Sequence, residues 1–159
     1  MSMSLLLAST PVMARSPGEF PSTIIYNPGF SCTVSVGKPH YSSYWAARGL
    51  DYVDTHTYVN CSEPANSITA VAYLYTLAMI GTYTYWYENP PGSGTQMNVV
   101  SYTSPQSKSA CTYGTYWWYG ASGLAYINGG PPQYASNSYS NVEVYCGILW
   151  PLLHISKPR

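Results

Sequence analysis

The chain has 159 residues, of which only 8% are Asp, Glu, Lys or Arg, and its formal net charge is zero. An average soluble domain carries about 25% charged residues. This chain therefore offers no basic field for nucleic acid and no acidic field for cations, and we expect neither a nucleic-acid partner nor a cofactor. Its length suits one domain with a single core. Polar character comes mainly from uncharged residues, among them 18 tyrosines.

The first 28 residues contain a short apolar run at residues 5–8, followed by small residues. A secretory signal has a basic start and about 7–15 apolar residues. This segment has neither, so a signal remnant and a flexible segment remain open as alternatives. No stretch reaches the roughly 18 apolar residues of a membrane span. We expect a β-sandwich domain over residues 29–147, with residues 148–159 as a tail or an extra edge strand.

Alternation of apolar and polar residues with a period of two predicts strands along most of the chain. Residues 68–80 are apolar on every side, and their β-branched and Tyr content favours a strand over a helix. The expected strands are residues 32–36, 52–61, 68–77, 82–88, 97–103, 112–127 (with a break between Gly120 and Gly123) and 142–146. The expected turns are residues 37–39, 63–66, 89–94, 104–105 and 128–132. This pattern predicts an antiparallel, immunoglobulin-like β-sandwich of seven to eight strands.

Four cysteines are present, at positions 32, 61, 111 and 146, and none forms the close pair typical of zinc sites. We therefore expect no metal site. Three pairings are formally possible. Because the start of one antiparallel strand lies beside the end of its partner, the spacing favours Cys32–Cys61 and Cys111–Cys146. Such bonds need an oxidising compartment, which indicates a secreted, extracellular protein.

The stretch 111–120, CTYGTYWWYG, is the most aromatic part of the chain. Alternation places Trp117 and Tyr119 on one side of the strand, with Tyr116 and Trp118 on the other. A sandwich buries one side of each strand, so one pair should face the core and the other solvent, in either orientation. In the same way, residues 83–87 present Tyr and Trp rings on both sides. The expected binding residues are Tyr83, Tyr85, Trp86, Tyr87, Tyr116, Trp117, Trp118 and Tyr119.

Few residues favour catalysis. Asp54 and His56 share one side of a strand and His40 lies near a turn, but neighbours on one strand face lie side by side at about 7 Å. The nucleophile-elbow motif of hydrolases is missing from the sequence. We therefore expect no catalytic residues and no enzyme.

The order of motifs resembles a group of small secreted four-cysteine proteins of actinomycete bacteria. The resemblance covers about three quarters of the chain, and it implies a secreted, disulfide-linked β-sandwich without an assigned activity. The chain departs from the group in the loop INGGPPQYA and in the residues that follow Cys146. The matching residues are Cys32, Val34, Val36, Pro39, His40 and Ser42, then Leu74 and Tyr75, then Cys111, Gly114 and Tyr116.

Exposed Tyr and Trp rings with little charge suit two functions. They are typical of protein contacts, including self-association, where these residues dominate binding energy. They also suit neutral sugars, because a pyranose stacks on an aromatic ring while hydroxyls and amides bond its hydroxyl groups. The sequence favours a non-catalytic structural or interaction protein, with carbohydrate or cell-wall binding as the alternative. A small secreted hydrolase is the least favoured reading.

Overall fold

The computed structural model describes residues 23–27 and 30–147, and the expectations for residues 1–22 and 148–159 lie outside this part of the chain. The described residues form antiparallel strands and one short helix, which confirms the all-β prediction. The elements are β1 (Thr23–Asn27), β2 (Phe30–Val36), β3 (His40–Tyr41), α1 (Ser43–Ala46), β4 (Tyr52–Thr55), β5 (Thr57–Ile80), β6 (Tyr83–Glu88), β7 (Gly92–Thr103), β8 (Ser107–Ala110), β9 (Tyr116–Ile127), β10 (Pro132–Tyr134) and β11 (Tyr139–Tyr145).

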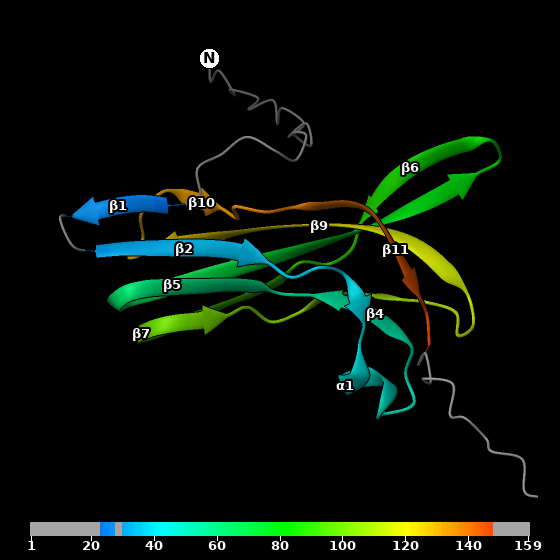
Figure 1. Ribbon diagram of the computed structural model, residues 1–159, viewed down its shortest axis with the longest axis horizontal. Helices are drawn as coiled ribbons and strands as arrows, with labels where there is room; N and C mark the ends of the chain where they lie inside the picture. The colour runs from blue at the N-terminus through cyan, green and yellow to red at the C-terminus, as the bar shows by residue number, and fades with distance from the viewer. Residues whose placement is uncertain (1–22, 28–29, 148–159) are drawn as a thin grey trace, which may run out of the picture.

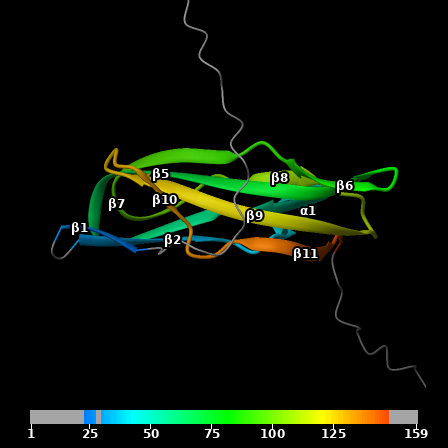
Figure 2. The same ribbon diagram turned by 90° about the horizontal axis from the view of Figure 1, so that it is seen from above.

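The larger sheet is organised around β5. Its strand order is β1-β2-β5-β9-β10, with β11 on the outer edge of β9 and with β7 and β6 following one another along β5. The sheet curls into a half-barrel, and the smaller sheet β3-β4-β8 lies with α1 at one end of it (Figures 1 and 2). An immunoglobulin-like pairing of two facing sheets is not confirmed by this curled arrangement. Because β1 pairs with β2, the sheet includes residues that the sequence assigned to the N-terminal segment.

Strand β5 is continuous over 24 residues, so the turn predicted at residues 63–66 is wrong. The register between β5 and β7 shifts between Asn60 and Ala65, and Pro64 lies in that interval. A proline cannot donate to a ladder, and a bulge removes the need for that donor. The break predicted between Gly120 and Gly123 is also wrong, because β9 pairs with β5 through both glycines. Strand β7 begins at Gly92 rather than at residue 97.

The concave side of the curl holds the core. Every second residue of β5 from Ile68 to Leu74 is fully buried there. Around Ile68 the core contains Val34, Val59 and Ile127, and around Leu74 it contains residues from both sheets and β11. The curl is completed by hydrogen bonds that the residues after β10 make with β2.

Residues 135–137 connect the two ends of the curled sheet. The Ala135 N–H donates to the Gly123 carbonyl of β9 at 2.8 Å, and the Ser136 N–H donates to the Val34 carbonyl of β2 at 2.8 Å. The Asn137 amide then accepts from the Val36 N–H at 3.0 Å and donates to the Val36 carbonyl at 2.8 Å. This segment therefore satisfies backbone groups on the outer edge of β2 that β1 does not reach.

Both predicted disulfides are confirmed. Cys32 and Cys61 are directly opposed residues of β2 and β5, 29 residues apart in sequence. Cys111 follows β8 and bonds Cys146 just after β11, 35 residues further on. The first bond lies within the core of the curl, and the second joins the loop before β9 to the end of β11.

The buried Tyr119 gives the fold a dependence on alkaline pH. Burial raises the pKa of its phenol to about 12, although the nearby Ser109 hydroxyl opposes the shift. The phenol is therefore more acidic in the unfolded chain, where its pKa is about 10. Its contribution to stability is complete below pH 10 and is lost as the pH rises through 12. We expect the free energy of unfolding to fall by about 2–3 kcal/mol over that interval.

Thermal melts of Tyr119→Phe between pH 9 and 12 test this dependence, because the variant has no phenol to titrate at that position. The melting temperature should fall less steeply with pH than in the parent chain. Tyr116→Phe is the matched control, since Tyr116 lies on the same strand and is 61% exposed. Equal slopes for Tyr119→Phe and the parent chain would contradict the prediction.

Candidate functional site

The convex side of the larger sheet gathers aromatic side chains from several strands. Directly opposed residues of antiparallel neighbours point to the same face. Tyr75 of β5 is opposed by Glu88 of β6 on one edge and by Gly120 of β9 on the other. Since Leu74 points into the core, Tyr75 and its opposed residues point outward. The same register places further rings of β6, β9, β10 and β11 on this side.

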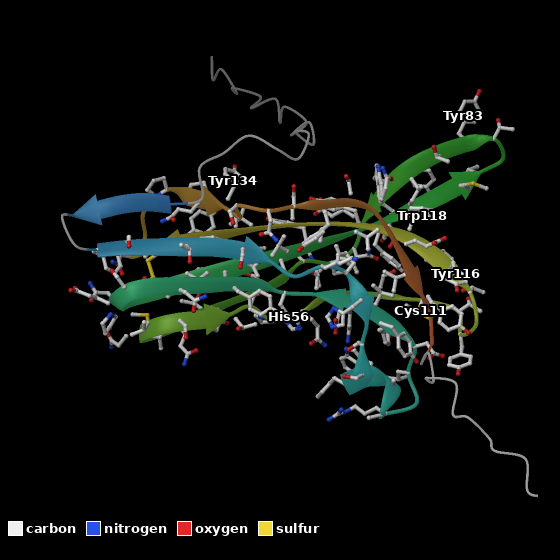
Figure 3. The ribbon with its side chains drawn as sticks, viewed as in Figure 1. His56, Tyr83, Cys111, Tyr116, Trp118 and Tyr134 are labelled. Carbon is white, nitrogen blue, oxygen red and sulfur yellow. A yellow bond between two sulfur atoms is a disulfide. The ribbon has the colours of Figure 1, made fainter. Side chains whose placement is uncertain are left out.

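We call this set of rings the aromatic face. It consists of Tyr73, Tyr75, Trp86, Tyr116, Trp118, Tyr126, Tyr134 and Tyr145. Figure 3 shows Tyr134 on β10 and Trp118 and Tyr116 toward the start of β9, so the face extends along the length of β9.

Contacts within the aromatic face link neighbouring strands. The rings of Tyr116 and Tyr145 lie 5.0 Å apart between centroids. A Cβ added to Gly120 would lie 3.7 Å from the Trp86 ring, an ordinary contact distance, so Trp86 of β6 lies over Gly120 of β9. The hydroxyl of Tyr75 lies 3.3 Å from that of Ser122. The rings therefore form a connected surface.

The surface combines apolar rings with hydroxyl groups and little charge. Tyr116 is 61% exposed and Trp118 43% exposed. Burial raises the pKa of Tyr73 and of Tyr75, so both phenols keep their protons and remain hydrogen-bond donors. By register Glu88 and Glu143 belong to the same side of the sheet. The face can bind by stacking and hydrogen bonding, and it has weak electrostatic preferences.

A hairpin projects from the sheet beside this face. The ladder between β5 and β9 ends at Thr76 and Tyr119, but the ladder between β5 and β6 continues to Ile80 and Tyr83. We call residues 77–88 the projecting hairpin; it is the green pair of strands beyond β9 in Figure 1. Every side chain of β6 is exposed. Tyr83, Tyr85 and Tyr87 lie on the opposite face of the hairpin from Trp86.

Hydrogen bonds at its base fix the direction of the projecting hairpin. The buried Asn89 donates from its backbone N–H to the Leu74 carbonyl at 2.9 Å and from its side chain to Thr76 Oγ1 at 2.9 Å. The Ser107 hydroxyl accepts from the Leu74 N–H at 3.1 Å and donates to the Pro90 carbonyl at 2.9 Å. Along this edge of β5, β7 pairs with residues up to Ala72 and β6 pairs from Tyr75 onward. The bonds of Asn89 and Ser107 occupy the interval between these two ladders.

An open hollow of about 580 Å³ lies between the projecting hairpin and the start of β9. Residues 77–79 line one side and residues 115–118 the other. It forms because the two strands separate beyond Thr76 and Tyr119. Exposed Tyr116 and Trp118 belong both to this hollow and to the aromatic face.

The predicted binding residues are divided between surface and core. Tyr116 and Trp118 are exposed, whereas Tyr119 is fully buried and Trp117 is half-buried against the core. The indole of Trp117 donates to Thr115 Oγ1 at 2.6 Å. The prediction that the two pairs face opposite sides is confirmed, with Trp117 and Tyr119 inside. Tyr119 therefore cannot contact a partner, and the expectation that it binds one is wrong.

Sequence reasoning missed five members of the aromatic face: Tyr73, Tyr75, Tyr126, Tyr134 and Tyr145. Alternation within residues 69–75 and 120–126 could have found the members on β5 and β9, because each lies two or four residues from another outward-facing residue. The positions of Tyr134 and Tyr145 depend on how β10 and β11 align with β9, which alternation alone does not set.

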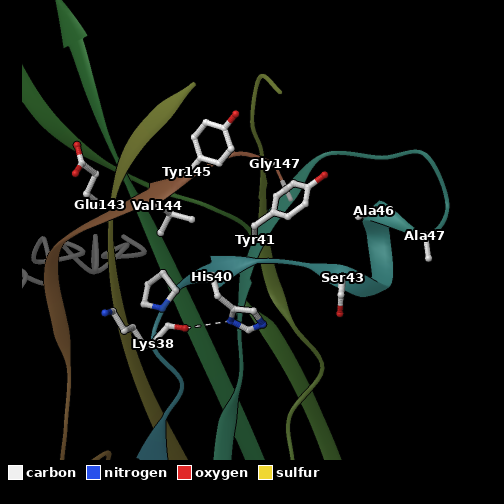
Figure 4. Close-up of a pocket in the computed structure, with 11 residues that line it drawn as sticks. Lys38, His40, Tyr41, Ser43, Ala46, Ala47, Glu143, Val144, Tyr145 and Gly147 are labelled. Atoms are coloured by element: carbon white, nitrogen blue, oxygen red, sulfur yellow. Dashed lines mark hydrogen bonds between the residues drawn. The ribbon is translucent and has the colours of Figure 1, made fainter. Parts of the chain in front are cut away.

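The histidine and aspartate weighed for catalysis pair differently from the sequence expectation. Asp54 faces His40 of the neighbouring strand β3, with 3.3 Å between its Oδ1 and the His40 Nε2. The His40 Nδ1 lies 3.1 Å from the Lys38 carbonyl oxygen (Figure 4). Acceptors thus lie beside both ring nitrogens, whereas a general base needs one nitrogen free for the substrate proton. His56 instead has its Nδ1 2.9 Å from the Ser104 carbonyl oxygen.

His40 and Tyr41 border a second open hollow, of about 700 Å³, between β3, α1 and the end of β11. The Tyr41 hydroxyl donates to Asp51 at 2.5 Å, and this hydrogen bond, together with burial, raises the pKa of Tyr41 to about 12. The phenol is thus held as a neutral donor. These contacts hold β3 and the loop before β4 in place, and they leave the aromatic face as the candidate site.

Within residues 23–27 and 30–147, no group of three or more His, Cys, Asp or Glu side chains is placed to hold a metal ion. Nor does this part of the chain contain a helix long and apolar enough to cross a membrane. Comparisons with protein-family models, with curated proteins and with solved structures found no match to the chain.

Proposed function

We propose that this chain is a secreted, non-catalytic interaction protein that contacts protein through the aromatic face and the projecting hairpin. The observation that carries the proposal is the projecting hairpin, because its β6 side chains are exposed on both faces and its base is fixed by buried hydrogen bonds. A rigid, exposed, ring-rich element that contributes little to the core is typical of a contact surface.

The composition of the surface supports the same proposal. Soluble monomers seldom leave large contiguous apolar patches exposed. Here Met79 is 73% exposed, Ile80 66% and Tyr83 80%, all at the tip of the projecting hairpin. Secretion is supported by the two disulfides, which persist in oxidising compartments.

Removing two rings from the aromatic face tests the proposal. In Trp86→Ser/Trp118→Ser, light scattering over a wide concentration range and affinity capture from the secreted proteins of the producing cells should both show weaker protein association. Truncation of buried interface aromatics costs about 2 kcal/mol or more, so we expect at least a roughly tenfold rise in the dissociation constant. Tyr44→Ser is the control, because Tyr44 is 53% exposed on α1, away from this surface.

The proposal fails if the parent chain is a monomer at every concentration and if every protein that it captures is captured equally well by the double variant. Circular dichroism of both variants shows whether they keep the fold. Loss of association by Tyr44→Ser to the same degree would likewise place the contact outside the aromatic face.

A second candidate function is binding of a neutral polysaccharide, as in the bacterial or fungal cell wall. It is favoured by the row of rings along β9, where protonated phenols and Ser122 supply hydrogen bonds beside stacking surfaces. Retention of a monomer on insoluble chitin, cellulose or peptidoglycan, lost in Trp86→Ser/Trp118→Ser, would establish this function. A parent chain that passes through all three materials would exclude it for these polymers.

A further inference from the structure

Strand β6 has an open edge. One of its edges pairs with β5 from Tyr75 to Ile80 without a register shift, so the strand is regular over all six residues. Within the described part of the chain, no strand pairs with its other edge. Such an edge presents a row of unpaired backbone N–H and C=O groups, which is a template for another strand.

The sequence of β6 lacks the features that usually prevent edge pairing. Natural edge strands are protected by lysine, proline, bulges, inward-pointing charges or a covering loop. Residues 83–88, YTYWYE, contain no lysine or proline, and their only charge is Glu88 at the base of the hairpin. Aromatic and β-branched residues fill the remaining positions, and these have high strand propensity.

We propose that the open edge of β6 joins a second copy of this chain in an antiparallel pair around a two-fold axis, so that the two larger sheets become one. The inference rests on the proposed function and names its partner as the same protein. Isologous contacts of this kind are the commonest way in which soluble proteins form dimers.

The pattern of β6 fits such a pair. A two-fold axis perpendicular to the sheet keeps each face on its own side, so opposed residues must have numbers of the same parity. With Tyr85 opposite its own copy, Tyr83 faces Tyr87, and Trp86 faces Thr84. Aromatic pairs and aromatic–threonine pairs stabilise antiparallel strands. Glu88 faces Thr82, so no like charges oppose each other.

The pairing also extends the aromatic face. Trp86 is 42% exposed and lies on the same side of the sheet as Trp118 and Tyr75. Joining two β6 strands brings the Trp86 rings of both copies onto one continuous surface. The dimer would thus carry two aromatic faces side by side across a shared sheet.

Charge exchange at Tyr85 tests the pairing. In Tyr85→Lys two ammonium groups would oppose each other at the axis, and in Tyr85→Glu two carboxylates would. We expect each variant alone to raise the dissociation constant of the dimer at least about tenfold by light scattering. Mixing the two variants should restore association, because opposite charges then face each other. Tyr44→Lys and Tyr44→Glu are the controls, since Tyr44 is 53% exposed on α1, away from β6; the same changes at Tyr126 report on contact through the aromatic face instead.

Loss of association in both single variants without recovery in their mixture overturns the inference. Association that is lost in each Tyr85 variant but restored when the two variants are mixed supports the inference. Such recovery also shows that both variants are folded. If the dissociation constant is unchanged in the Tyr85 variants but rises in the Tyr126 variants, the inference is overturned and the proposed function still stands. A monomeric parent chain that captures another protein through the aromatic face does the same. A monomeric parent chain that captures nothing overturns both.

Discussion

Replacing Cys32 and Cys61 together by alanine is expected to lower the free energy of unfolding by about 4 kcal/mol or more. The bond closes a loop between residues 29 positions apart, and loop-closure entropy alone corresponds to about 3–4 kcal/mol. Both sulfurs are buried among Val34, Val59 and Ala65, so the alanines also leave space in the core, which adds to the loss. A domain of this size has only about 5–15 kcal/mol in total.

Guanidinium unfolding of the double variant measures this loss. The matched control is Cys111→Ala/Cys146→Ala, which opens a loop of similar length. Cys146 is fully buried but Cys111 is only half-buried at the end of the smaller sheet, so this removal should cost the entropic part with a somewhat smaller packing loss. A Cys32→Ala/Cys61→Ala loss below about 1 kcal/mol would show that the bond contributes little to the folded chain.

Gly123→Ala should destabilise the protein by about 3 kcal/mol. A Cβ at position 123 would overlap the Thr57 hydroxyl, and it would lie 3.2 Å from the Thr57 Cβ and Cγ2. Thr57 is fully buried and its hydroxyl donates to the Val71 carbonyl at 2.8 Å. Overpacking costs about 1–3 kcal/mol, and a displaced buried hydrogen bond adds about 1–3 kcal/mol.

Two further variants isolate the cause. Gly37→Ala is the control, because its Cβ would meet the flexible end of the Tyr58 side chain at 3.3 Å, so its unfolding free energy should change by less than about 1 kcal/mol. In Gly123→Ala/Thr57→Ala the overlap is removed, so the two losses should not add. Additive losses in chemical unfolding would show that position 123 does not contact Thr57.

The sequence predicted the all-β class and both disulfides because these depend on local alternation and on where strands begin and end. It did not predict that β5 is continuous. Pro64 is a strong turn signal, and only the register of β7 against β5 shows that a bulge accommodates it. The curl of the larger sheet was missed for a similar reason, because it depends on bonds between Ser136 and Asn137 and the distant strand β2.

The candidate site was predicted in part. Alternation separated Tyr116 and Trp118 from Trp117 and Tyr119. Which of the two pairs is buried depends on the other strands that pack against it. Tyr119 is buried because Val53 of the smaller sheet and Val144 of β11 pack against it. Those residues are far away in sequence, so alternation within residues 113–119 could not reveal the choice. For residues 83–87 alternation placed rings on both sides and predicted that one side is buried, but every β6 side chain is exposed because the hairpin continues past the end of the β5–β9 ladder.

The bonds that Ser136 and Asn137 make with β2 constrain the order in which the protein can fold. They join positions 101 and 102 residues apart, and such distant contacts make all-β proteins fold slowly, in about milliseconds to seconds. During synthesis the backbone groups of β2 at Val34 and Val36 stay without these partners until Ser136 and Asn137 have been made. Cys32 and Cys61 are made much earlier, so their bond can hold β2 against β5 until Asn137 has been synthesised. The first disulfide thus protects an early pair of strands, β2 and β5, whose remaining neighbour on the β2 edge is synthesised about 100 residues later.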